Sequence, residues 1–140
     1  MPCQHQQFRP RSLVEVVARR QSDGDLNRHL REFLDEFYIE QDSAQRQAML
    51  DPEPELLADE KLNAYLGAAA EHLAHLYGLD VPPWCENSER FLHRAHFPCG
   101  LESLKATYIK ESPSAFRRRM IFVEADPLYR PRKDHPNFGE

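Results

Sequence analysis

Apolar residues recur at helical spacing in blocks along this chain, and prolines and turn signals separate the blocks. The clearest block runs from Leu26 to Phe37, where leucines and phenylalanines fall three or four residues apart and charged residues occupy the other side. The 140 residues include only 5 glycines but 11 prolines, which favours helices with proline boundaries over a hairpin-rich sheet. We therefore predict an all-α fold, a compact bundle of about five to seven helices, some of them short.

Capping signals mark several helix ends. Ser12 precedes Glu15 at the spacing of a capping box, Asp23 or Asp25 suits the start of the second helix, and Gly78 suits a left-handed helix end. Ser112, followed by Pro113, predicts a further start. The predicted helices cover residues 12–20, 26–37, 42–50, 54–77, 88–93, 101–109 and 113–120, with a short extended segment near 121–123.

The domain organisation follows from the same pattern. Residues 1–11 are polar and lack periodicity, which predicts a disordered lead; residues 12–130 form a single helical domain; residues 131–140 are a loose tail. No apolar stretch approaches the roughly 18 residues of a membrane span, and the N-terminus lacks an apolar signal core. The three cysteines do not form a disulfide framework. We expect a cytoplasmic protein with no membrane contact.

The charge is unevenly distributed along the chain. Residues 23–80 hold 14 acidic against 4 basic side chains, residues 113–133 hold 6 basic against 2 acidic ones, and the formal net charge is -5. Either the segments complement each other within one fold, which is the favoured interpretation, or they face a charged partner. The net negative charge makes nucleic acid an unlikely main partner.

Four residues form the nearest approach to a metal-ligand pattern: Cys85, His93, His96 and Cys99. Zinc prefers four nitrogen or sulfur ligands in a tetrahedral array, but no Cys-x-x-Cys pair is present and Pro98 constrains the chain before the last cysteine. We keep these residues only as a weak candidate site and predict no metal and no cofactor.

Three consecutive arginines, Arg117, Arg118 and Arg119, follow the helix start at Pro113. On a continuous helix, Phe116 and Met120 would share the buried face, Arg117 and Arg119 would flank it, and Arg118 would point to solvent. Three interpretations follow: pairing with acids from the middle of the chain, which is favoured, contact with a partner protein, or contact with nucleic acid.

An acidic helix face forms the second candidate contact surface. Asp35 and Glu36 lie on the polar side of the helix over 26–37, where a solvated face is the default interpretation. We predict that Asp35, Glu36 and the three arginines are the partner-binding residues. The chain contains no P-loop, no dinucleotide-binding glycine motif and no nucleophile elbow. A non-enzymatic role is therefore favoured.

Several segments resemble a family of small, uncharacterised bacterial proteins. The segments are Phe33–Tyr38 (FLDEFY), Ala64–Ala74, Val81–Trp84, Arg90–Leu92 and Glu111–Val123 (ESPSAFRRRMIFV), the last being the most specific. The likeness covers about residues 25–130, although the chain departs from it around His96 and Cys99. It implies an all-α protein without an assigned active site, encoded beside nucleotidyltransferase-like proteins of the toxin–antitoxin type.

Composition, charge and this resemblance together favour a protein-interaction domain, an antitoxin-like partner of a neighbouring gene product. Two alternatives stay open. The first is a DNA-binding or autoregulatory module that uses the helix from Pro113 and the basic ends of the chain, and the second is a small metal-dependent enzyme. A salt titration of duplex DNA binding separates the first alternative from a protein binder.

Overall fold

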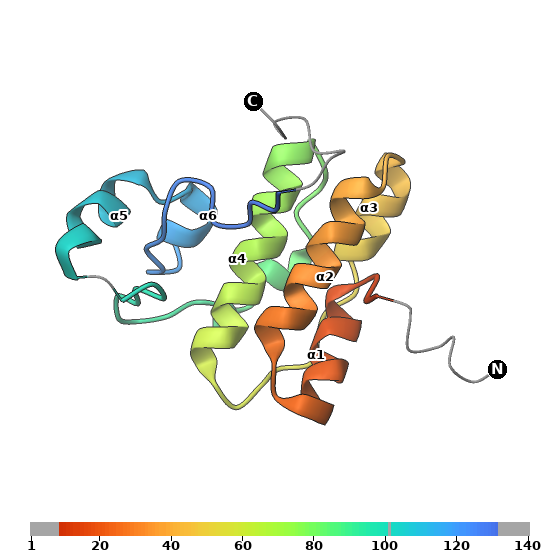
Figure 1. Ribbon diagram of the computed structural model, residues 1–140, viewed down its shortest axis with the longest axis horizontal. Coiled ribbons are helices and arrows are strands. Elements are labelled where there is room, and N and C mark those ends of the chain that lie inside the picture. The colour runs from red at the N-terminus through yellow and green to blue at the C-terminus, as the bar shows by residue number, and fades with distance from the viewer. Residues whose placement is uncertain (1–8, 101, 132–140) are drawn as a thin grey trace. The chain divides into compact units, whose positions relative to one another are not determined.

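The computed structural model describes residues 9–100 and 102–131. Helices and loops make up this part of the chain, which confirms the all-α prediction (Figure 1). The α-helices are α1 (Leu13–Asp23), α2 (Leu26–Ile39), α3 (Ser43–Leu50), α4 (Glu60–Tyr77), α5 (Lys105–Glu111) and α6 (Ser114–Arg117). Short 3-10 helices are η2 (Pro83–Glu86), η3 (Ser88–Arg90) and η4 (Glu102–Leu104). None of the described helices is both long and apolar enough to cross a membrane.

The chain divides into two compact units. Unit 1 holds the described residues up to Glu55 together with Arg130 and Pro131, and unit 2 is Leu56–Tyr129. The tail over 132–140 and most of the lead over 1–11 lie outside the described residues. Within the lead, the structure describes Arg9 to Arg11, where the Arg11 guanidinium binds Glu36 and Glu40 of α2.

Unit 1 begins with two helices whose starts were predicted correctly, although α1 continues to Asp23, beyond the predicted end at residue 20. The Ser12 hydroxyl accepts a hydrogen bond from the Glu15 N–H at 3.2 Å, and Gly24 ends α1 in the left-handed conformation at φ 73°. Asp25 caps α2 by accepting from the Arg28 N–H. The short turn formed by Gly24 and Asp25 brings the two helices side by side (Figure 1).

The core of unit 1 combines apolar residues of α1, α2 and α3. Phe33 and Phe37 of α2 are fully buried, with ring centroids 5.9 Å apart. The remaining buried apolar residues are Leu13, Val16, Val17, Leu26, Leu30, Leu34, Met49 and Leu50. Arg46 of α3 donates to the carbonyl groups of Phe37 and Tyr38, which the end of α2 leaves without intrahelical partners.

Unit 2 is built on α4, which starts later than predicted. The prediction placed the helix start near Pro54, but the structure begins the helix at Glu60, with the Asp59 carboxylate accepting from the Lys61 N–H. The Asn63 side chain explains the difference, because its amide binds both the N–H and the carbonyl of Leu57 and holds that residue outside the helix. Gly78 ends α4 in the left-handed conformation, as predicted.

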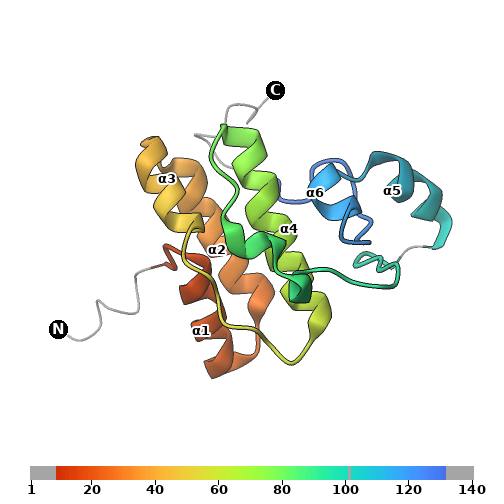
Figure 2. The ribbon, with the colours of Figure 1, turned by 180° about the vertical axis from the view of Figure 1, so that it is seen from behind.

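The 3-10 helices η2 and η3 lie against α4, as Figure 2 shows from behind. Gly67 of α4 faces them: a Cβ atom there would lie 3.0 Å from the Arg90 Cβ and 3.3 Å from the Arg119 Nε. The small residue therefore admits two arginine side chains to the helix surface.

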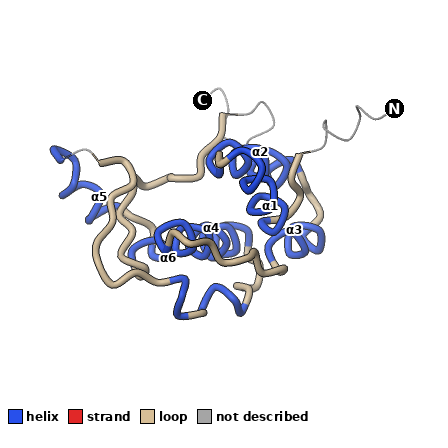
Figure 3. The backbone as a smooth tube through the Cα atoms, turned by 90° about the horizontal axis from the view of Figure 1, so that it is seen from below, coloured by secondary structure: helices blue, strands red, loops and turns tan. Residues whose placement is uncertain are grey.

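Two extended segments meet in the last part of unit 2. His96 and Ile121 form a single parallel bridge, which confirms the short extended segment predicted near 121–123. The rings of Phe97 and Phe122 stack beside the bridge with centroids 5.3 Å apart. Figure 3 shows these segments as loops, without a strand in the described residues.

Candidate functional site

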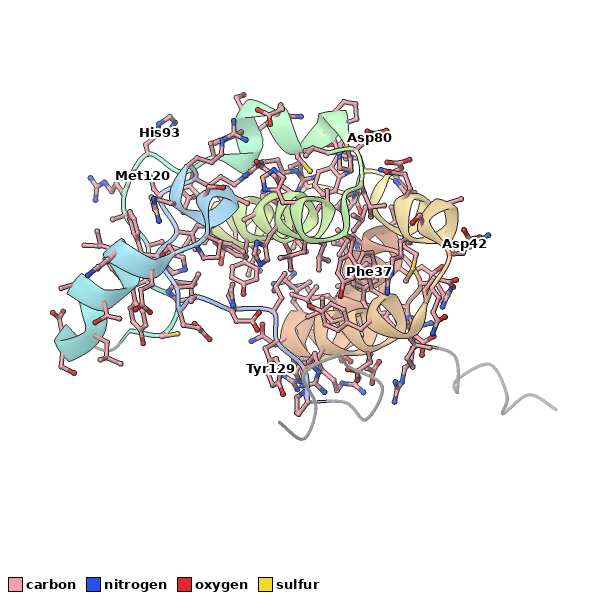
Figure 4. All side chains as sticks on the ribbon, turned by 90° about the horizontal axis from the view of Figure 1, so that it is seen from above. Phe37, Asp42, Asp80, His93, Met120 and Tyr129 are labelled. Atoms are coloured by element: carbon pink, nitrogen blue, oxygen red, sulfur yellow. The ribbon has the colours of Figure 1, made fainter. Side chains whose placement is uncertain are left out.

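The stretch from Pro113 to Val123 forms less helix than predicted. α6 ends at Arg117, and Met120 (labelled in Figure 4) has a φ of 66°, in the left-handed region that few residues other than glycine occupy. The Phe116 carbonyl accepts from the N–H groups of both Arg119 and Ile121, so the chain turns here. The prediction that Phe116 and Met120 share a helix face is wrong, because Met120 lies beyond the helix end.

Ser112 does not cap α6, contrary to the prediction. The N-cap is Pro113, which supplies no side-chain hydrogen bond. The buried Ser112 Oγ instead accepts from the Val123 N–H at 2.8 Å and lies within hydrogen-bonding distance of the Tyr108 and Val123 carbonyl oxygens. Ser112 thereby joins the end of α5 to the segment after the arginines.

Arg119 is a buried structural residue. Its side chain is 0% exposed and donates to the carboxylate of Glu71, to the Ala115 carbonyl at 2.8 Å and to the Cys85 carbonyl at 2.7 Å. Its guanidinium also lies over the Phe91 ring, 4.5 Å from the centroid. The prediction that Arg119 pairs with an acid from the middle of the chain is confirmed by Glu71.

Arg118 lies at the surface and is also paired. It donates to both carboxylate oxygens of Glu86 at 2.9 Å and to Glu71 at 2.8 Å, and it stacks over Phe91. The hydrogen bonds that Arg118 donates to Glu86 raise the pKa of Arg118 and lower the pKa of Glu86. Arg118 was predicted to point to solvent; its side chain is exposed, but it is paired with Glu71 and Glu86 rather than free.

Arg117 makes a third kind of contact. Its guanidinium donates to the Ser112 carbonyl at 2.6 Å and to the Lys110 carbonyl at 3.5 Å. These carbonyls lie at the end of α5, where backbone acceptors lack intrahelical donors. All three arginines therefore have partners within unit 2.

The acidic candidates, Asp35 and Glu36, lie in unit 1 and contact its basic residues. Asp35 is buried and accepts from Arg130 at 3.0 Å, with Arg9 at 3.7 Å. Glu36 accepts from Arg11 at 3.2 Å. Asp35 is thus not on a solvated face, because an arginine 95 residues along the chain covers it.

The four residues of the weak metal candidate are not brought together. Cys85 is buried in η2, where burial raises the pKa of its thiol to about 12. The exposed Cys99 donates to the Glu124 carboxylate, with 3.7 Å between sulfur and oxygen. His93 and His96 line a surface hollow, and no group of three potential ligand side chains is placed to hold a metal ion within residues 9–100 and 102–131.

Two open hollows of opposite charge lie next to each other in unit 2, sharing Glu60 and His93. The acidic hollow has a volume of about 590 Å³ and is lined by Glu60, Asn63, Glu86, Ser88, Glu89, Phe91 and His93. The basic hollow has a volume of about 440 Å³ and is lined by Glu60, Lys61, Leu92, His93, Arg94, Ala95 and His96. Figure 4 shows the His93 side chain pointing outward at this edge of the unit.

Sequence reasoning missed the residues that organise this region. Glu71 was not among the predicted contact residues, yet it binds Arg118 and Arg119, and Arg90 stacks fully buried over Trp84. Trp84, six residues before Arg90, was the available signal, because buried arginines commonly stack on aromatic rings. Glu60, Lys61 and Arg94 carried no local signal, since each belongs to an ordinary polar segment.

Fold and site define an all-α protein whose arginine run is internally paired and whose unit 2 carries two charged hollows. We find no match to this chain among protein-family models, curated proteins or solved structures.

Proposed function

We propose that the protein is a non-enzymatic interaction domain, an antitoxin-like partner that binds the product of a neighbouring gene. The observation that carries the proposal is the acidic hollow of unit 2. Of its three carboxylates, Glu86 is paired with Arg118, whereas Glu60 and Glu89 have no ion-pair partner among the described residues. Unpaired carboxylates around an open hollow favour a basic partner surface.

The contacts of Arg118 indicate which partner side chain the hollow accepts. This guanidinium binds Glu86 through two hydrogen bonds while stacking over Phe91. Glu60 and Glu89 line the same hollow as Glu86 and Phe91. An arginine of a partner protein that enters the hollow meets carboxylates next to an aromatic ring, the combination that arginine prefers at interfaces.

The net charge and the family resemblance support the same role. A protein with a formal net charge of -5 attracts a basic partner at long range and accelerates its association. The resemblance to small bacterial proteins encoded beside nucleotidyltransferase-like proteins identifies the class of partner to test first.

The direct test is co-expression of the chain with its neighbouring gene product, followed by size-exclusion chromatography at micromolar concentration. We expect one peak that contains both proteins. Glu60→Gln and Glu89→Gln together should weaken the complex by about tenfold or more, because each removes a charge that faces the partner. Glu111→Gln is the matched control, since Glu111 is exposed in α5 of the same unit and outside the hollow.

Two outcomes would count against the proposal. The first is elution of the two proteins in separate peaks. The second is a complex whose affinity Glu111→Gln lowers as much as the double variant does. Binding to duplex DNA with a steep loss between low and moderate salt would favour the DNA-binding alternative instead.

A further inference from the structure

The basic hollow of unit 2 combines two permanent cations with two imidazoles. Lys61 comes from the first turn of α4, whereas His93, Arg94 and His96 come from the extended segment after η3. Glu60 is the single carboxylate in the lining. The hollow, at about 440 Å³, lies within the range of roughly 300–1,000 Å³ that small-molecule pockets occupy.

Lys61 and Arg94 of this hollow differ from the three arginines of the run, because only the arginines of the run are paired within the described part of the fold. Arg117, Arg118 and Arg119 all bind carbonyl or carboxylate oxygens of unit 2. Lys61 and Arg94, by contrast, have no ion pair within the part of the chain that the structure describes. Positive charge that the fold leaves uncompensated in a concave surface attracts anions, because the low-dielectric walls focus its field.

The protonation of His96 supports this interpretation. Burial lowers the pKa of His96, and the charge of Lys61 lowers it further, although Asp59 acts in the opposite direction. The positive field of Lys61 therefore reaches the wall of the hollow. An anion in the hollow would offset that field.

We propose that this hollow is a binding site for the phosphate group of a small molecule. Arginine binds two phosphate oxygens at once through its planar guanidinium, and lysine adds a compact positive charge. The imidazole N–H groups of His93 and His96 supply further donors. The two fixed cations outnumber the single carboxylate, which suits an anion.

This site goes beyond the proposed partner contact and can be tested separately. The two hollows share Glu60 and His93, but Lys61 and Arg94 line only the basic one. Substitutions of Lys61 and Arg94 therefore examine phosphate binding, and the Glu89 carboxylate belongs to the partner contact alone.

The experiment is a titration of the full chain with inorganic phosphate and, separately, with adenosine 5′-monophosphate, at an ionic strength kept constant with chloride. Amide shifts in ¹H–¹⁵N spectra report the binding. We expect saturable shifts at residues 60–61 and 92–96. Tighter binding of the monoester identifies a phosphate ester as the ligand type, and equal binding identifies the phosphate group alone.

Lys61→Gln and Arg94→Gln should each weaken binding by about tenfold, the effect of losing one charge-assisted hydrogen bond. Lys110→Gln, in exposed α5, is the matched control and should leave the affinity unchanged. Absence of saturation with both probes would overturn the proposal. Equal weakening in all three variants would overturn it as well, because that result is expected of non-specific attraction.

Discussion

Glu71→Gln is expected to destabilise unit 2 strongly, because Glu71 compensates a buried arginine. The Arg119 side chain is 0% exposed, and Glu71 is the carboxylate that binds it. Removing one partner of a buried ion pair lowers the free energy of unfolding by about 3–5 kcal/mol, because the other charge stays buried without compensation. The glutamine oxygen can still accept one hydrogen bond, and the Ala115 and Cys85 carbonyls remain in place. We therefore expect the free energy of unfolding to decrease by an amount near the lower end of this range, about 3 kcal/mol.

Urea unfolding followed by circular dichroism measures this loss through linear extrapolation at constant ionic strength. The matched control is Glu86→Gln, which removes the exposed partner of Arg118 and should cost less than about 1 kcal/mol. A loss for Glu71→Gln no larger than that of the control would refute the reasoning.

A double variant separates charge compensation from packing. Glu71→Leu combined with Arg119→Met removes both buried charges, so the double variant should lose clearly less stability than the two single variants added together. Simple additivity of the two losses would mean that the residues act independently, which contradicts the direct contact between them.

Two further predictions concern the core of unit 2. Gly67→Ala should lower the unfolding free energy by about 1–2 kcal/mol, because the new methyl group lies 3.0 Å from the Arg90 Cβ, and this crowding exceeds the gain in helix propensity; a more stable variant in urea unfolding would contradict it. Burial lowers the pKa of His72 from its ordinary value of 6.5, so the folded protein favours neutral His72. The free energy of unfolding should therefore decrease as the pH falls from above 6.5 towards the lowered pKa. His72→Leu should flatten this part of the pH dependence in urea unfolding, and an unchanged slope would exclude His72 as its cause.

The helices of unit 1 could be predicted because their signals are local. Ser12 and Asp25 each accept from a backbone N–H three residues further along, and this local spacing is what predicted Ser12, and Asp23 or Asp25, as caps. The apolar spacing from Leu26 to Phe37 likewise reports one face of one helix. Such features require no knowledge of what lies elsewhere in the chain.

The arginine run could not be placed from sequence because distant partners determine its conformation. Arg119 reaches a carboxylate 48 residues earlier in the chain, and the chain leaves the helical path at Arg118 and Met120 beside that contact. A helical projection assumes a continuous helix and shows no partner from elsewhere in the chain, so it left the exposed Arg118 unpaired. Asp35 shows the same limit, because its partner Arg130 lies in the last described segment.

Acidic and basic residues from distant parts of the sequence pair with each other within each unit. In unit 2, Glu71 from the acidic middle of the chain binds Arg118 and Arg119 from the basic part, and in unit 1 Asp35 binds Arg130. The residues first expected to meet a partner are thus largely used by the fold. Glu60, Glu89, Lys61 and Arg94, which have no ion pair among the described residues, line the two hollows, and for that reason the hollows, rather than the arginine run, are where binding is best tested.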